Sequence, residues 1–109
     1  METFQGTKKQ RFGNKHKEIL RVLFTSPGNK VELIQTFLYA AGNLDINMVT
    51  YGADISIGLP AMIICDRKKK VISPKEEGYC EQILDICRKE NIDLVVPLSE
   101  DDRVLARFT

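Results

Sequence analysis

Short apolar runs alternate along this chain with longer segments in which apolar residues recur every three or four positions. The first pattern is typical of strands buried in a parallel sheet, and the second is typical of helices that cover such a sheet. Together they predict four strands, at 20–25, 46–51, 70–73 and 92–96. They also predict two long helices, over 31–41 and 79–90, and a short helical turn at 61–65.

Turn and capping residues mark the ends of these elements. Ser26-Pro27-Gly28-Asn29 closes the first strand, and Gly42-Asn43 and Asn91 are expected to stop the two helices. Near the end of the chain, Ser99-Glu100-Asp101-Asp102 has the form of a helix N-cap with an acidic third position. The helix that it would start reaches only Thr109, so we expect the natural chain to continue.

The alternation of strands and helices predicts a Rossmann-like α/β domain with three layers and a mainly parallel sheet of about four strands. Right-handed crossovers place the first strand centrally, the second and third strands on one side of it, and the fourth on the other. Ligands bind such sheets beyond the carboxyl ends of the strands, at the switch point between the first and fourth strands. Candidate site residues are therefore those in the loops that leave this edge.

Two of these loops follow the first and second strands. Gly28, Asn29 and Lys30 stand at a helix N-terminus, where backbone amides and the lysine can hold an anion. The loop lacks the G-x-G-x-x-G of a dinucleotide fold and the G-K-[ST] of a P-loop, so a plain turn is the alternative. Asp54 either occupies the place of a ribose-binding acid or is a turn residue that caps its loop.

Acidic residues follow the fourth strand as well. Helix capping would account for Ser99 and Asp102, and it leaves Glu100 free to bind a ligand. Amides of the first loop favour an anion, whereas the carboxylates favour an amine or hydroxyl donor. A mixed-sign edge of this kind suits a substrate that carries both groups, such as an amino acid. The predicted substrate-binding residues are Gly28, Asn29, Lys30, Asp54, Glu100 and Asp102.

Composition and charge narrow the class of protein. With 109 residues, 43% of them apolar, the chain suits one globular domain. Its 16 basic and 15 acidic residues leave a net charge of +1, but the basic ones gather at the start. Residues 1–18 are predicted to form a basic polar tail and residues 19–109 the domain. Acidic residues interrupt the tail, so a solvated tail is favoured over a nucleic-acid contact.

Membrane, metal and catalytic functions are not expected. The apolar stretches are too short to span a bilayer, and residues 1–17 lack the apolar region of a signal peptide, so a cytoplasmic protein is predicted. Cys65, Cys80 and Cys87 form no CxxC pair, and the single histidine, His16, has no ligand-type neighbours. No cluster combines a nucleophile, a base and oxyanion donors, so we predict no metal site and no catalytic residue.

Several segments, in their order and spacing, resemble the pre-ATP-grasp domain of ATP-grasp enzymes. They are Val22 to Gly28, Ala53-Asp54-Ile55-Ser56, Leu59-Pro60-Ala61, Cys65-Asp66, Pro74 and Glu81 to Pro97. The last segment is similar to a helix-and-strand run of carbamoyl-phosphate-synthase-like members, and Glu100 and Asp102 fall where that group carries an acidic D-x-E pair. The chain departs from the group at Gly28-Asn29-Lys30, where many members have Gly-Arg-Arg.

This resemblance implies a domain that works as part of a larger enzyme. ATP-grasp ligases join a carboxylate to an amine through an acyl phosphate, with ATP and magnesium bound in two later domains. Their N-terminal domain closes one side of the active site and helps to bind the non-ATP substrate. By resemblance, the chain is a non-catalytic, substrate-side domain without a cofactor of its own, joined to a C-terminal ATP-grasp domain.

Two other functions stay open on the sequence alone. A free-standing Rossmann-like module could bind a nucleotide or pair with a separate ATP-binding subunit, and the reading frame beyond Thr109 distinguishes it from a ligase domain. Nucleic-acid binding through residues 8–17 would show a steep salt dependence. The sequence is compatible with a homo-oligomer, and it identifies neither the substrate nor the oligomeric state.

Overall fold

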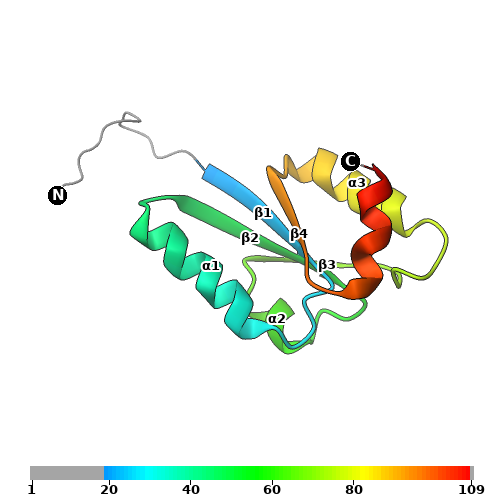
Figure 1. The fold of residues 1–109 in the computed structure, drawn as a ribbon, viewed down its shortest axis with the longest axis horizontal. Helices are drawn as coiled ribbons and strands as arrows, with labels where there is room; N and C mark the ends of the chain where they lie inside the picture. Colours follow the sequence, from blue (N-terminus) through cyan, green and yellow to red (C-terminus); the bar gives the residue numbers. More distant parts are fainter. Residues whose placement is uncertain (1–18, 109) are drawn as a thin grey trace.

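Four parallel strands form one sheet at the centre of the domain, in the order β3-β2-β1-β4 (Figure 1). The computed structural model describes residues 19–108. The strands are β1 (Ile19–Thr25), β2 (Asn47–Asp54), β3 (Arg67–Lys70) and β4 (Leu94–Pro97). β1 pairs with β2 along its whole length and with β4 over its second half. The predicted order, with the first strand central, is therefore confirmed.

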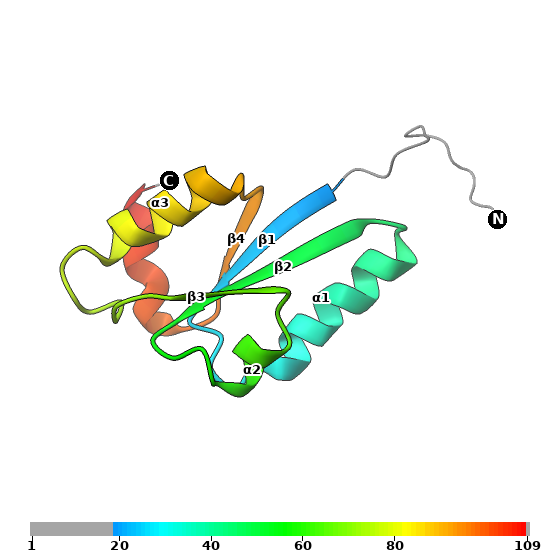
Figure 2. The same cartoon turned by 180° about the vertical axis from the view of Figure 1, so that it is seen from behind.

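Helices cover both faces of the sheet and complete the predicted three-layer Rossmann-like α/β fold (Figures 1 and 2). On one face lie α1 (Val31–Asn43) and α2 (Pro60–Ile63), and on the other lie α3 (Tyr79–Glu90) and the 3₁₀ helix η1 (Glu100–Phe108). None of the described helices is long and apolar enough to cross a membrane. Residues 22–25 of β1 are all buried, because their side chains alternate between two covered faces.

Two apolar clusters fill the spaces between the layers. The cluster on the α1 face contains Val22, Phe24, Ile34, Ala61 and Cys65. The cluster on the α3 face contains Leu23, Tyr51, Ala53, Val71, Tyr79, Cys80, Ile83 and Leu105. Neighbouring residues of β1 thus belong to different clusters, so this central strand contributes side chains to both halves of the core.

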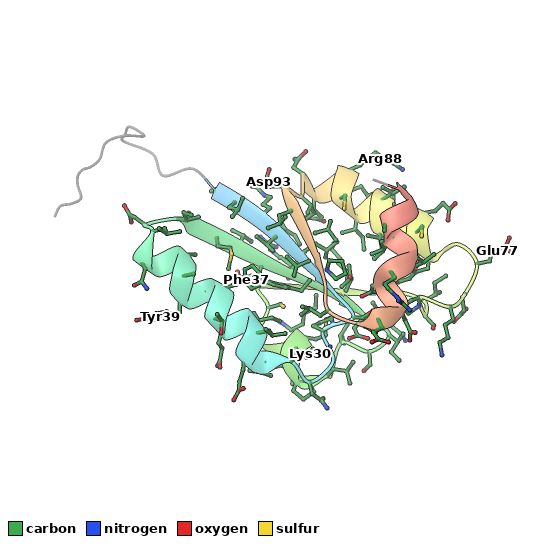
Figure 3. The ribbon with its side chains drawn as sticks, viewed as in Figure 1. Lys30, Phe37, Tyr39, Glu77, Arg88 and Asp93 are labelled. Carbon is green, nitrogen blue, oxygen red and sulfur yellow. The ribbon has the colours of Figure 1, made fainter. Side chains whose placement is uncertain are left out.

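The long helices bury one side each, as their apolar spacing predicts. In α3, Ile83 is 2% exposed, as a residue on the apolar side of this helix should be. In α1, Phe37, which is labelled in Figure 3, is only half-buried. Its ring meets that of Phe24 edge to face, with the ring centroids 5.3 Å apart. Phe37 therefore packs at the margin of its cluster.

The two helix ends were predicted with different success. Asn91 ends α3 in the left-handed conformation with a φ of 56°, as expected. The predicted stop of α1 at Gly42-Asn43 is wrong, because the helix runs through both residues. The left-handed residue here is Asp45, with a φ of 58°, and the amides of Leu44 and Asp45 bond back to carbonyls of the last helical turn. A polar residue beyond the glycine thus ends this helix.

β3 lies before the predicted strand at 70–73, and its position in the sheet explains the difference. It is an edge strand that pairs only with β2, from Tyr51↔Arg67 to Asp54↔Lys70. An edge strand has one open side, so a run of cationic residues can pair there without being buried. The apolar residues at 71–72 follow the strand and pack against α3 instead.

The last two elements also differ from the prediction. β4 begins at Leu94 rather than at Ile92, whose amide bonds back to the carbonyl of Cys87 in α3 at 3.0 Å. The final segment is a 3₁₀ helix rather than an α-helix. Its start is capped as expected, since Ser99 Oγ accepts a hydrogen bond from the Asp101 amide at 3.2 Å.

Gly52 lets α2 lie directly against β2. A Cβ at this position would come within 2.6 Å of the sulfur of Met62 and within 3.1 Å of the sulfur of Cys65. Both of these residues are buried. The absence of a side chain in the middle of β2 is therefore what allows the short helix to pack there.

We expect Gly52→Ala to lower the free energy of unfolding by about 1–3 kcal/mol, because the added methyl overpacks a filled space. Urea denaturation of the chain measures this. Gly42→Ala is the matched control, since nothing lies within 4 Å of its Cβ position inside α1. That variant should gain about 0.5–1 kcal/mol from helix propensity. Equal stability changes at the two positions would contradict the close packing of α2.

Truncation of Ile83 tests the assignment of the buried helix faces. Ile83→Ala should cost about 2–5 kcal/mol, because it empties space in the core. Phe37→Ala should cost less than this, since part of the ring is already exposed. Ile63→Ala, at a side chain that is 61% exposed, should stay within about 0.5 kcal/mol of the wild type. A cost below about 1 kcal/mol at both Ile83 and Phe37 would show that these faces are misassigned.

Candidate functional site

The loops after β1, β2 and β4 leave the same end of the sheet, because all of its strands are parallel. This end carries all six residues that the sequence predicted to bind substrate. Figure 3 shows Lys30 between the end of β1 and the start of α1. The structure therefore brings the three predicted loops to one edge, with the switch point between β1 and β4 at its centre.

The β1–α1 loop is held by backbone hydrogen bonds on both sides. Ser26 takes the left-handed conformation with a φ of 50°, and its amide donates to the carbonyl of Ala53 at 2.8 Å. Gly28 has a φ of 52°, which a glycine adopts at no steric cost. Its carbonyl accepts the amide of Ala61 at the start of α2 at 3.0 Å. These hydrogen bonds thus hold the loop against β2 and α2.

Asp54, at the end of β2, makes further hydrogen bonds that hold the β1–α1 loop. One of its carboxylate oxygens accepts the amide of Gly28 at 2.9 Å, and the other accepts the amide of Ile55 at 2.7 Å. Asp54 is 7% exposed. It caps its own loop, as the alternative interpretation of the sequence held, and it also joins this loop to the β1–α1 loop. The amide of Gly28 therefore points into the domain.

Asp102 lies behind the edge as an internal acceptor for three hydroxyl groups. Its carboxylate is fully buried, with 0% exposure. Thr25 Oγ1 donates to one oxygen at 2.8 Å, and Ser26 Oγ and the Tyr79 hydroxyl donate to the other at 3.0 and 2.7 Å. The side chain does not cap η1, which corrects the capping interpretation. It joins the end of β1 to the start of α3.

Tyr79 stays a hydrogen-bond donor throughout the physiological pH range. Burial raises the pKa of its hydroxyl, because the phenolate would lose its solvation, and the neighbouring Asp102 carboxylate raises it further. The neutral phenol therefore always carries the proton that it donates to Asp102. A rise in pH within this range does not release the contact.

Three of the six predicted residues stay accessible at the edge. Asn29, Lys30 and Glu100 are exposed. Lys30 Nζ donates to the carbonyl oxygen of Leu98, so this side chain spans the switch point from the β1 loop to the β4 loop. This partner is an uncharged carbonyl, so the hydrogen bond does not neutralise the positive charge of Lys30. Glu100 follows two residues after Leu98, and a cationic and an anionic side chain thus border the switch point.

This arrangement can bind a small polar molecule. The described residues include no group of three or more His, Cys, Asp or Glu side chains that could hold a metal ion. Burial raises the pKa of the Cys65 thiol to about 11, which keeps it protonated and unreactive at neutral pH.

Sequence reasoning missed the hydroxyl groups that hold this edge together. The sequence marks Tyr79 only as the first residue of a predicted helix, and Thr25 and Ser26 only as a strand end and a turn. In the sequence, these three residues share only a hydroxyl group near the end of a strand or the start of a helix. Many surface residues have the same feature. Their common partner, Asp102, is 77 residues from Thr25 along the chain.

Removal of one hydroxyl tests the internal role of Asp102. We expect Tyr79→Phe to lower the free energy of unfolding by about 1.5–3 kcal/mol, the range for a hydrogen bond to a charged group. Asp102→Ala should cost more, since it leaves three hydroxyl donors without their acceptor. Tyr39→Phe is the matched control, because Tyr39 is 74% exposed and should change stability by less than about 0.5 kcal/mol. Urea denaturation with Tyr79→Phe as stable as the wild type would contradict this role.

Comparison with known proteins identifies the kind of domain. Residues 22–108 match the family described as "PylC-like, N-terminal domain", from the buried part of β1 to the end of η1. No curated protein gives a significant match to the chain. The matched region contains the whole sheet edge described above, including Asp54 and Asp102. Since the match covers most of the chain, the chain belongs to the PylC-like N-terminal domain family, a domain of the pre-ATP-grasp type.

Proposed function

We propose that this chain is the substrate-side N-terminal domain of an ATP-dependent carboxylate–amine ligase. The family match carries the proposal, because it assigns the chain to the pre-ATP-grasp type of domain. ATP and magnesium would bind to an ATP-grasp domain of the same protein. The run from Glu81 to Pro97 further supports a likeness to carbamoyl-phosphate-synthase-like ligases within this class.

In this proposal the three exposed groups at the edge contact the substrate. Lys30 supplies a positive charge for a carboxylate, and Glu100 supplies a negative charge for an amine. Asn29 can donate or accept a hydrogen bond beside them. Opposite charges at one site favour a substrate with both groups, such as an amino acid, over a polyphosphate. Gly28, Asp54 and Asp102, which the sequence placed in the same site, support the loops from within.

Separate variants distinguish contact residues from supporting ones. In the ligase that contains this domain, Lys30→Met and Glu100→Gln should each raise KM for the amino acid substrate about tenfold or more, which is the loss of one charged contact. KM for ATP should stay unchanged, because ATP binds elsewhere. Leu44→Ser is the control, because Leu44 is exposed and follows the far end of α1, away from this edge. A change in KM for ATP, or no change in either constant, would contradict the assignment.

The chain by itself should not turn over ATP. We expect no release of ADP above background when the purified chain is incubated with ATP, magnesium and a mixture of amino acids, because the described residues hold no catalytic cluster. A coupled assay for ADP measures this. ADP release that is lost in Glu100→Gln would show that the chain is itself an ATP-dependent enzyme and would overturn the proposal.

A further inference from the structure

An uncharged segment follows β2. Residues 55–65 form the loop between β2 and α2, all of α2 and the two residues after it, and none of them is charged. Three isoleucines of this segment, Ile55, Ile57 and Ile63, are each more than half exposed. Single exposed apolar side chains are common on soluble proteins, whereas several within one short segment mark a contact surface. The β2–α2 segment (residues 55–65) is therefore a candidate surface for contact with another domain.

Hydrogen bonds hold the β2–α2 segment beside the β1–α1 loop. The Ala61 amide donates to the carbonyl of Gly28 at 3.0 Å, and Asp54, directly before the segment, accepts the Gly28 amide at 2.9 Å. On the inner side of α2, Ala61 and Met62 are fully buried. Figures 1 and 2 show α2 next to the start of α1, the helix that Lys30 precedes. The segment thus borders the edge that carries Lys30, and its isoleucines stay on the outside.

The type of domain indicates which partner this surface meets. A domain of the pre-ATP-grasp type implies an ATP-grasp domain in the same protein. In the function proposed above, ATP binds to that second domain, and the substrate binds at the edge with Lys30 and Glu100. Because the reacting groups of ATP and the substrate have to come together, the second domain has to close over this edge. Closure brings it next to the β2–α2 segment.

We propose that Ile55, Ile57 and Ile63 form the surface against which the ATP-grasp domain of the same protein packs. This inference rests on the proposed function, which fixes the side from which the second domain approaches. Apolar, uncharged surfaces suit a permanent contact of this kind, because the two domains stay together and keep such surfaces away from water. We therefore expect the surface of the ATP-grasp domain that faces the β2–α2 segment to be apolar as well.

The exposed apolar side chains in and after α1 suit this contact less well. Leu38 and Tyr39 lie on the same helix as the exposed polar residues Gln35 and Thr36, so this surface is of mixed polarity. Leu44 follows the far end of α1, away from the edge over which the second domain closes. The position of Leu44 should therefore stay in contact with water in the intact protein.

Thiol labelling of the intact protein, which contains both domains, tests this contact. A maleimide reacts with the variants Ile57→Cys, Ile63→Cys and Leu44→Cys, first in the native state and then in urea, and mass spectrometry locates the label. We expect the ratio of the native rate to the urea rate to be at least tenfold lower at positions 57 and 63 than at position 44, because the second domain covers only the first two. Circular dichroism checks that each variant is folded. Similar ratios at all three positions would overturn the proposal.

Two further comparisons separate this proposal from its alternatives. Protection of Ile57→Cys should not depend on protein concentration, because the covering domain belongs to the same chain. Protection that is lost on dilution would assign the cover to a second copy and would overturn the proposal. If Lys30→Met and Glu100→Gln raise KM as expected but the labelling ratios are similar, only the docking surface is wrong. Protected isoleucine positions together with an unchanged KM would contradict the substrate site alone.

Discussion

A carboxylate that is closed off from water must receive hydrogen bonds from the protein, and Asp102 receives three of them. The donors come from the last residue of β1, the residue after it and the first residue of α3. The carboxylate itself stands at the start of η1. One buried group therefore holds together the end of the central strand, the helix that follows β3 and the C-terminal segment. The position of the β1–α1 loop depends on it, because Ser26 is one of the three donors.

Asp54 does similar work on the other side of the same loop. It accepts the Gly28 amide, and Gly28 in turn accepts the amide of Ala61 through its carbonyl. The loop beyond β1 is thus braced from β2, from α2 and from η1. Such bracing suits the substrate-side role that we propose, because a site on a rigid frame orients its ligand better than a mobile one. Acidic residues at this edge serve two different purposes, and burial separates them: Asp54 and Asp102 hold the frame, while Glu100 faces solvent.

Charge also distinguishes the two outer strands of the sheet. Cations fill β3, and one of them, Lys69, pairs with Glu90 at the end of α3 at 2.8 Å. Because the pair is partly exposed, it contributes little to the free energy of unfolding. Lysines and arginines along an edge strand commonly keep another strand from pairing there. The four residues of β4, the other outer strand among residues 19–108, are uncharged.

The sequence by itself determined the fold class, the strand order, the two long helices and the edge at which polar residues gather. These features follow from local apolar spacing and from the handedness of crossovers, which act on neighbouring segments. It misplaced β3, because a cationic run has no apolar signal and becomes a strand only by pairing with β2. It also predicted the same substrate-binding role for Asp102 and Glu100, because the sequence alone does not distinguish a buried acid from an exposed one two residues away. Only the tertiary structure separated them, because burial and the three hydroxyl donors come from segments far away in the chain, and no local pattern records which side chains will meet.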